Sequence, residues 1–248
     1  MLSWSKLESC SCSDSVGTGN GSHTETWGSM ARFDIQQAMA ALQAEAPQWA
    51  ETALTTVART MGRDPFKILI GCLLSLRTKD ETTGPAATRL FALAGSPVEM
   101  LQVPVDKIAQ AIYPVGFYRT KAKTILEVCR TLRERYGGRV PDTIEALLEL
   151  KGVGRKTANL VLTLGFQKPA MCVDTHVHRI SNRWGYVRTK DPEQTEFALR
   201  RKLPKAYWLV YNDLLVAFGQ NICKPVSPLC RQCQLDALCP KVGVQQHR

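Results

Sequence analysis

The sequence predicts an all-α protein, and three features of the chain support this fold class. Most segments carry apolar residues at the spacing of one helix face. Glycines 152 and 154 flank a single apolar residue between two such runs, where a tight turn between helices needs a permissive backbone. Four closely spaced cysteines follow the last helical run and predict a compact loop near the C-terminus.

Composition and charge narrow the class of partner. The chain has 248 residues, is 44% hydrophobic and carries a net charge of +10, which is enough for one large domain or two small ones. The charge favours a polyanionic partner, most simply nucleic acid, although a basic protein that only needs solubility would look the same. The sequence has neither an apolar run of membrane-spanning length nor a secretion signal, so we expect no membrane association and a cytoplasmic location.

The N-terminal third is predicted to pass from a tail into helices. Residues 1–30 are rich in Ser, Gly and Thr, which indicates a disordered tail, and Met30 is an alternative start. Residues 33–59 are predicted to form two helices separated at Pro47. A helix over residues 66–76 is apolar nearly all round, so we expect it to be buried.

The middle of the chain is predicted to continue as helices. Residues 84–114 form two helices divided near Gly95-Ser96-Pro97, and the loop 116–119 leads into an amphipathic helix over residues 119–139. Asp142 is predicted to cap the next helix, with Glu145 completing a capping box.

The Gly-Val-Gly hairpin and the segment behind it carry the candidate chemistry. Backbone N–H groups of the hairpin and of the following helical turn lack partners within the helix and predict a phosphate cradle. Lys156 lies in that first turn, and Asp174 lies eighteen residues later as the predicted N-cap of a helix over 175–184. Residues 192–220 are predicted to form two further helices split at Pro204.

The C-terminal cysteines have the spacing C-x6-C-x2-C-x5-C, formed by Cys223, Cys230, Cys233 and Cys239. Without an export signal, such a set predicts a metal site and not a disulfide framework. Thiolate chemistry alone leaves two occupants open, an iron–sulfur cluster and a zinc ion, although zinc usually takes two Cys-x-x-Cys pairs and only one is present.

Together these motifs resemble the endonuclease III branch of the helix-hairpin-helix DNA glycosylases. The shared sequence is Gly-Val-Gly-Arg-Lys-Thr-Ala followed by Val-Asp-Thr-His, and the resemblance runs from about residue 33 to 240. It implies that Lys156 is the nucleophile, that Asp174 is its essential carboxylate, and that the four cysteines hold a [4Fe–4S] cluster. It also implies a C1′ Schiff base followed by β-elimination on the 3′ side.

The resemblance also suggests where DNA is bound. Arg77 stands where a glutamine usually fills the gap left by the extruded base; the alternative is a phosphate contact or a solvated charge. Phe117 matches an apolar wedge, with capping of the core as the alternative. Lys151 replaces a common proline beside the hairpin. The predicted DNA-binding residues are therefore Arg77, Phe117, Lys151, Gly152, Val153, Gly154 and Arg155.

The implied architecture has two helical lobes with a DNA-binding cleft between them. Residues 57–167 would form the lobe with the helix-hairpin-helix motif, and residues 31–56 with 168–240 the iron–sulfur lobe, leaving 1–30 and 241–248 as tails. Lys156 and Asp174 would face each other across the cleft.

The function implied is base-excision repair by a bifunctional enzyme. It would remove oxidised pyrimidines of the thymine glycol type from double-stranded DNA and cleave abasic sites, as a monomer at the nucleoid of a bacterial cell. One alternative is a monofunctional adenine-mismatch glycosylase, but that branch lacks the hairpin lysine and carries a catalytic glutamate where Leu73 stands. The other is a non-catalytic DNA-binding iron–sulfur protein.

Overall fold

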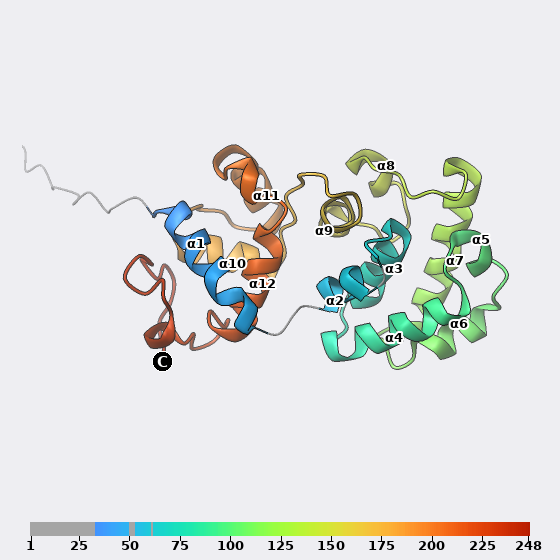
Figure 1. Ribbon diagram of the computed structural model, residues 1–248, viewed down its shortest axis with the longest axis horizontal. Coiled ribbons are helices and arrows are strands. Elements are labelled where there is room, and N and C mark those ends of the chain that lie inside the picture. The colour runs from blue at the N-terminus through green and yellow to red at the C-terminus, as the bar shows by residue number, and fades with distance from the viewer. Residues whose placement is uncertain (1–32, 50–52, 61) are drawn as a thin grey trace, which may run out of the picture. The chain divides into compact units, whose positions relative to one another are not determined.

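The computed structural model describes residues 33–49, 53–60 and 62–248, so the predicted tail 1–30 and the alternative start Met30 lie outside the described residues. Every regular element in these ranges is a helix, which confirms the all-α class (Figure 1). Within the same ranges, no helix combines the length and apolarity needed to cross a bilayer.

A first hydrophobic core is built on a helix that is buried on all sides. This helix, α3 (Pro65–Ser75), starts at Asp64, whose carboxylate accepts hydrogen bonds from the backbone N–H groups of Phe66 and Lys67 at 2.8 and 3.3 Å. Its burial confirms the sequence prediction. Around it lie α2 (Ala53–Thr60), α4 (Asp80–Leu93), α5 (Pro97–Met100), α6 (Val105–Ile112), α7 (Tyr118–Tyr136), α8 (Ile144–Leu148), α9 (Arg155–Leu160) and η2 (Val161–Gly165).

Two local predictions in this lobe were wrong. Residues 84–114 were expected to hold two helices, but a separate short helix, α5, lies between them because the Ser96 hydroxyl accepts a hydrogen bond from the backbone N–H of Glu99. Asp142 was expected to cap α8, but Thr143 does so, and its hydroxyl accepts from the N–H of Ala146. The Asp142 carboxylate instead binds Lys168 at 2.5 Å.

A second core gathers helices from both ends of the chain. It contains α1 (Ile35–Glu45), η1 (Ala46–Gln48), α10 (Thr175–Arg183), α11 (Pro192–Lys202), η3 (Lys205–Tyr207), α12 (Tyr211–Asn221) and the cysteine loop with η4 (Cys230–Gln232). Trp184 stacks on Phe33 with ring centroids 4.9 Å apart. The two cores define two helical lobes, called here the first and the second lobe (Figure 1).

The extended segment before Asp174 contributes to both lobes. Ala170 and Cys172 belong to the first core, whereas Met171 and Val173 belong to the second. Successive side chains of an extended backbone point in opposite directions, so this segment is held from both sides. Asp174 therefore lies where the two cores meet.

Candidate active site

The hairpin that presents Lys156 has the backbone its glycines predict. Gly152 has φ +77°, and a side chain there would also approach Thr124 within 3.3 Å, so glycine is required on two grounds. Gly154 is the N-cap residue of α9, and Lys156 lies in the first turn of that helix. The helix then continues as the π-helical turn of η2, a widening that is frequent at functional sites.

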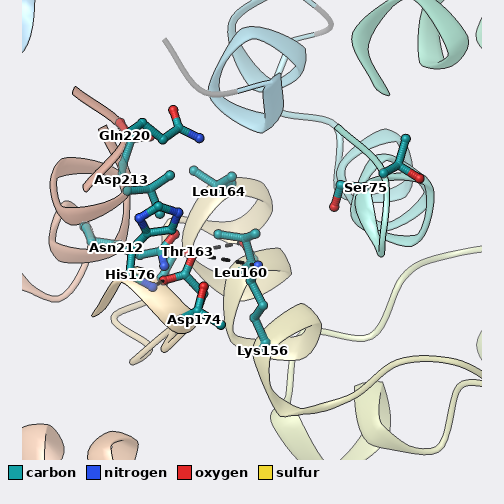
Figure 2. Close-up of a pocket in the computed structure, with 14 residues that line it drawn as sticks. Ser75, Lys156, Leu160, Thr163, Leu164, Asp174, His176, Asn212, Asp213 and Gln220 are labelled. Atoms are coloured by element: carbon teal, nitrogen blue, oxygen red, sulfur yellow. Dashed lines mark hydrogen bonds and ion pairs between the residues drawn. The ribbon is translucent and has the colours of Figure 1, made fainter. Parts of the chain in front are cut away.

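Lys156 faces Asp174, as predicted. The lysine Nζ lies 3.9 Å from Oδ2 of Asp174, with the lysine side chain 46% exposed and the aspartate 10% exposed. The other oxygen, Oδ1, accepts hydrogen bonds from the backbone N–H groups of His176 and Val177, both at 2.9 Å. The carboxylate thus does two things at once: one oxygen caps α10 and fixes the group, and the other points at the amine (Figure 2).

A pocket opens beside this pair, and both lobes line it. One wall comes from α9 and η2 of the first lobe, and the facing wall comes from α10 and α12 (Figure 2). Ser75, the last residue of α3, and Thr78, in the turn between α3 and α4, also line the pocket. The facing wall includes His176, Asn212, Asp213, Val216 and Gln220.

The sequence did not point to the α12 wall. Its signal is weak but present: Asn212, Val216 and Gln220 follow one another at intervals of four residues, so they share a helix face. The apolar residues of α12 that fill the core lie between them in sequence, such as Leu215 and Phe218. Only the position of that helix against α10 shows that the polar face lines a pocket.

The predicted wedge residue Phe117 is paired with Arg77. Both residues have left-handed backbones, with φ of +59° and +55°, and the guanidinium carbon lies 4.8 Å from the ring centroid. The Phe117 side chain is 59% exposed, so it does not cap the core. Arginine and phenylalanine therefore project as one stacked unit.

Lys121 holds the turn that carries Arg77. Its ammonium donates to the carbonyls of Leu74 and Leu76 at 2.7 and 2.5 Å and to the hydroxyl of Thr78 at 3.2 Å. Burial lowers the pKa of Lys121 to about 8. The same Thr78 hydroxyl accepts from the N–H of Gly116, which ties this turn to the Phe117 loop.

Stability measurements on Phe117 can test whether its backbone is strained. A left-handed conformation costs a non-glycine residue about 1–2 kcal/mol. We expect Phe117→Gly to unfold in urea with a free energy about 1 kcal/mol higher than that of Phe117→Ala, since both lose the ring and only glycine loses the strain. A Phe117→Gly variant less stable than Phe117→Ala would contradict a strained backbone, because the greater entropy of glycine in the unfolded chain would then outweigh any relief of strain at the φ of +59°.

Two of the predicted DNA-binding cations already have partners on the protein. Lys151 forms an exposed ion pair with Glu127 at 2.7 Å, with both residues in the first lobe. Arg155 donates two hydrogen bonds to Glu196 on α11 of the second lobe. The roles of these side chains toward DNA, and of Arg77, Phe117 and the hairpin glycines, stay predictions.

The four predicted ligand cysteines lie around one small pocket of the second lobe. Cys223, Cys230, Cys233 and Cys239 are all free thiols, partly buried, and they line this pocket together with the ring of Trp184 and the side chain of Phe218. Arg183 donates to the Cys223 sulfur at 3.4 Å. In the described part of the chain, no three His, Cys, Asp or Glu side chains are grouped so as to hold a metal ion.

Comparison with known proteins places the chain in a family. The model for the HhH-GPD superfamily of base excision DNA repair proteins matches residues 70–205, which include Lys156 and Asp174. Endonuclease III of Thermotoga maritima is 52% identical over 176 residues, covering 71% of this chain and 83% of that protein. A non-covalent endonuclease III–DNA complex matches with a TM-score of 0.72 and 35% identity over 83% of this chain and 95% of the other.

A second solved structure, a trapped endonuclease III–DNA covalent intermediate, matches with a TM-score of 0.70 and 33% identity over the same 83% and 95% of the two chains. The fold and site thus define a helix-hairpin-helix protein of base-excision repair. The chain belongs to the endonuclease III family, which confirms the resemblance drawn from its motifs. It is accordingly a DNA glycosylase and abasic-site lyase.

Proposed function

We propose that this enzyme removes oxidised pyrimidines from double-stranded DNA and cleaves the resulting abasic site, with Lys156 as nucleophile and Asp174 as its carboxylate. The observation that carries the proposal is the 3.9 Å approach of Lys156 Nζ to Asp174 Oδ2 at the edge of a pocket. The matching trapped covalent complex of endonuclease III supports a covalent route.

The chemistry assigned to the pair begins with an amine that must lose its proton before it can attack. Asp174 Oδ2, which lies 3.9 Å from the Lys156 nitrogen, would accept that proton or stabilise positive charge on the sugar. The Lys156 nitrogen bonds to C1′ while the C1′–N bond breaks, and the base leaves with the electron pair and takes up a proton. Opening of the sugar ring moves a proton from the nitrogen to O4′ and gives an imine at C1′. Loss of a C2′ proton to water then expels the 3′ phosphate oxygen, and water hydrolyses the imine to free the lysine.

DNA recognition is proposed to use the stacked Arg77–Phe117 unit and the hairpin residues 151–154. An apolar ring inserted between base steps unstacks and kinks a duplex, and the target base must leave the stack before C1′ can be reached. The pocket beside Lys156 would receive that base. The net charge of +10 suits the phosphate backbone. We propose that the protein acts as a monomer on double-stranded DNA at the nucleoid of a bacterial cytoplasm.

The cysteine loop is proposed to hold a [4Fe–4S] cluster. An all-thiolate donor set around one pocket fits such a group, and Cys223, Cys230, Cys233 and Cys239 would be its ligands. The cluster would join the four cysteines and so hold together a loop that has few core residues of its own. Arg183 would then stabilise the negative charge near Cys223.

The adenine-mismatch alternative has less support from this site. The position at which that branch carries its catalytic glutamate is Leu73, which is 3% exposed and packed in the first core. A buried aliphatic side chain supplies no proton donor. The non-catalytic alternative has to explain why a lysine and a carboxylate face each other beside the pocket.

Borohydride trapping tests the proposed function. We expect the purified full chain to form a covalent adduct with a duplex containing thymine glycol and with one containing an abasic site, because reduction fixes the Schiff base. An undamaged duplex is the matched control. Release of the base without an adduct would favour the monofunctional alternative. Binding of the duplex with neither base release nor an adduct would favour the non-catalytic alternative.

A further inference from the structure

A closed ring of hydrogen bonds joins α9 of the first lobe to α11 of the second. Arg155 donates from Nε and Nη2 to the two carboxylate oxygens of Glu196 at 2.9 and 2.6 Å. Glu196 is only 3% exposed. These hydrogen bonds raise the pKa of Arg155 above its usual value. A bidentate arginine–carboxylate pair fixes orientation as well as distance.

Two further residues complete the ring. Arg200, one turn after Glu196, lies 2.8 Å from the same carboxylate and donates to the side-chain oxygen of Asn159 at 3.1 Å. The Asn159 amide donates in turn to the backbone carbonyl of Arg155 at 3.0 Å. Each lobe thus supplies two members, and we call the four residues the lobe clamp.

The lobe clamp lies next to the catalytic pair in the chain. Arg155 directly precedes Lys156, so the clamp anchors the first turn of α9. Glu196 lies on α11, which packs against α10, the helix that Asp174 caps. Lys156 and Asp174 thus each lie at the start of a helix that is joined to the clamp, Lys156 on α9 directly and Asp174 on α10 through α11.

We propose that the lobe clamp is a positioning device that sets the distance between Lys156 and Asp174, and that Arg155 serves this junction instead of binding a DNA phosphate. The inference rests on the roles proposed above for Lys156 and Asp174. It differs from them in naming Glu196, Asn159 and Arg200 as positioning residues. It also withdraws Arg155 from the predicted DNA contacts.

An exposed ion pair provides a matched control. Lys151 and Glu127 are also an oppositely charged pair near the hairpin, but both lie in the first lobe and both are well exposed. Lys151→Gln removes the same charge as Arg155→Gln, four residues away, without touching the junction. Arg155→Gln also leaves Arg200 in place to neutralise Glu196, so this variant avoids an unpaired buried carboxylate.

Carbodiimide cross-linking measures the geometry without relying on activity. The reagent activates a carboxylate and lets a neighbouring amine form an amide as the urea leaves. We expect the wild-type protein to give a cross-link between Lys156 and Asp174, detected by peptide mass spectrometry. Its yield should fall several-fold in Arg155→Gln and in Glu196→Gln, and remain unchanged in Lys151→Gln.

Kinetics and salt dependence complete the test at a temperature well below unfolding. Single-turnover trapping at saturating thymine glycol duplex should slow on the order of 10- to 100-fold in Arg155→Gln, since small misplacements of reacting groups carry such effects. The slope of log affinity against log salt should match wild type. A slope reduced by about 0.9 would instead identify a phosphate contact and overturn the proposal.

The remaining outcomes are also decisive. An unchanged cross-link yield in both clamp variants would overturn the positioning role, whatever their activity. Should the wild type form no adduct with any duplex while the clamp variants still lose the cross-link, the proposed function would fail and the clamp would stand. If Glu196→Gln does not fold, Arg155→Gln alone carries the test.

Discussion

Replacing Lys156 with glutamine should abolish covalent trapping on both thymine glycol and abasic duplexes. Glutamine has a similar length and keeps the pocket filled, but its amide cannot form an imine. Loss of a nucleophile that no neighbour replaces typically costs on the order of 10⁴-fold or more in turnover. Denaturing gels after borohydride reduction measure the adduct, and strand cleavage on the same duplexes measures the lyase step.

Stability should be nearly unaffected, which makes this variant informative. The Lys156 side chain is 46% exposed and its contact with Asp174 is 3.9 Å long, so the ion pair contributes less than about 1 kcal/mol to folding. A variant that melts like wild type, binds DNA and does not trap isolates the chemistry. An adduct that persists would mean that another amine forms the Schiff base, and the assignment to Lys156 would be wrong.

The sequence predicted the parts of this molecule that depend on short stretches of chain. Asp174 caps α10 because a carboxylate can reach N–H groups two and three residues ahead, and this cap was predicted. Asp64 caps α3 in the same way, although the sequence analysis predicted only the helix that follows it. Gly152 was predicted because its left-handed turn needs no distant partner. The Thr143 cap was missed because Asp142 and Thr143 are adjacent and both residue types cap helices. Asp142 is instead paired with Lys168, 26 residues away, and Thr143 caps α8.

The parts that were missed depend on contacts between distant residues. Arg155 and Glu196 lie 41 residues apart, and no local pattern shows that one satisfies the other. The prediction that Arg155 binds DNA was made from its place beside the hairpin alone, and it stays a prediction. The stacking of Arg77 on Phe117 and the pocket wall formed by α12 were missed for the same reason, because each depends on residues far apart in the chain.

Asp174→Asn should separate the two tasks of this side chain. Asparagine caps helices about as well as aspartate, so its oxygen can still accept from the N–H groups of His176 and Val177, and α10 should keep its start. The amide cannot accept a proton from Lys156 or balance positive charge on the sugar. We therefore expect a single-turnover rate reduced by roughly 10²- to 10⁴-fold.

Asp174→Ala provides the matched comparison, because it loses the cap and the charge together. It should unfold with a free energy about 1 kcal/mol below that of Asp174→Asn, the usual cost of an N-cap, while both variants are similarly slow. Thermal melts and single-turnover trapping on one thymine glycol duplex give both quantities.

If Asp174→Asn kept nearly full activity, the oxygen that faces Lys156 would have no chemical role, and the carboxylate would be a helix cap alone. If instead the rates of the two variants followed their stabilities, loss of α10 and not loss of charge would explain the defect. We expect neither of these two results. Asp174 Oδ1 caps α10, whereas Oδ2 lies 3.9 Å from the Lys156 amine, so the carboxylate has a contact beyond its helix cap.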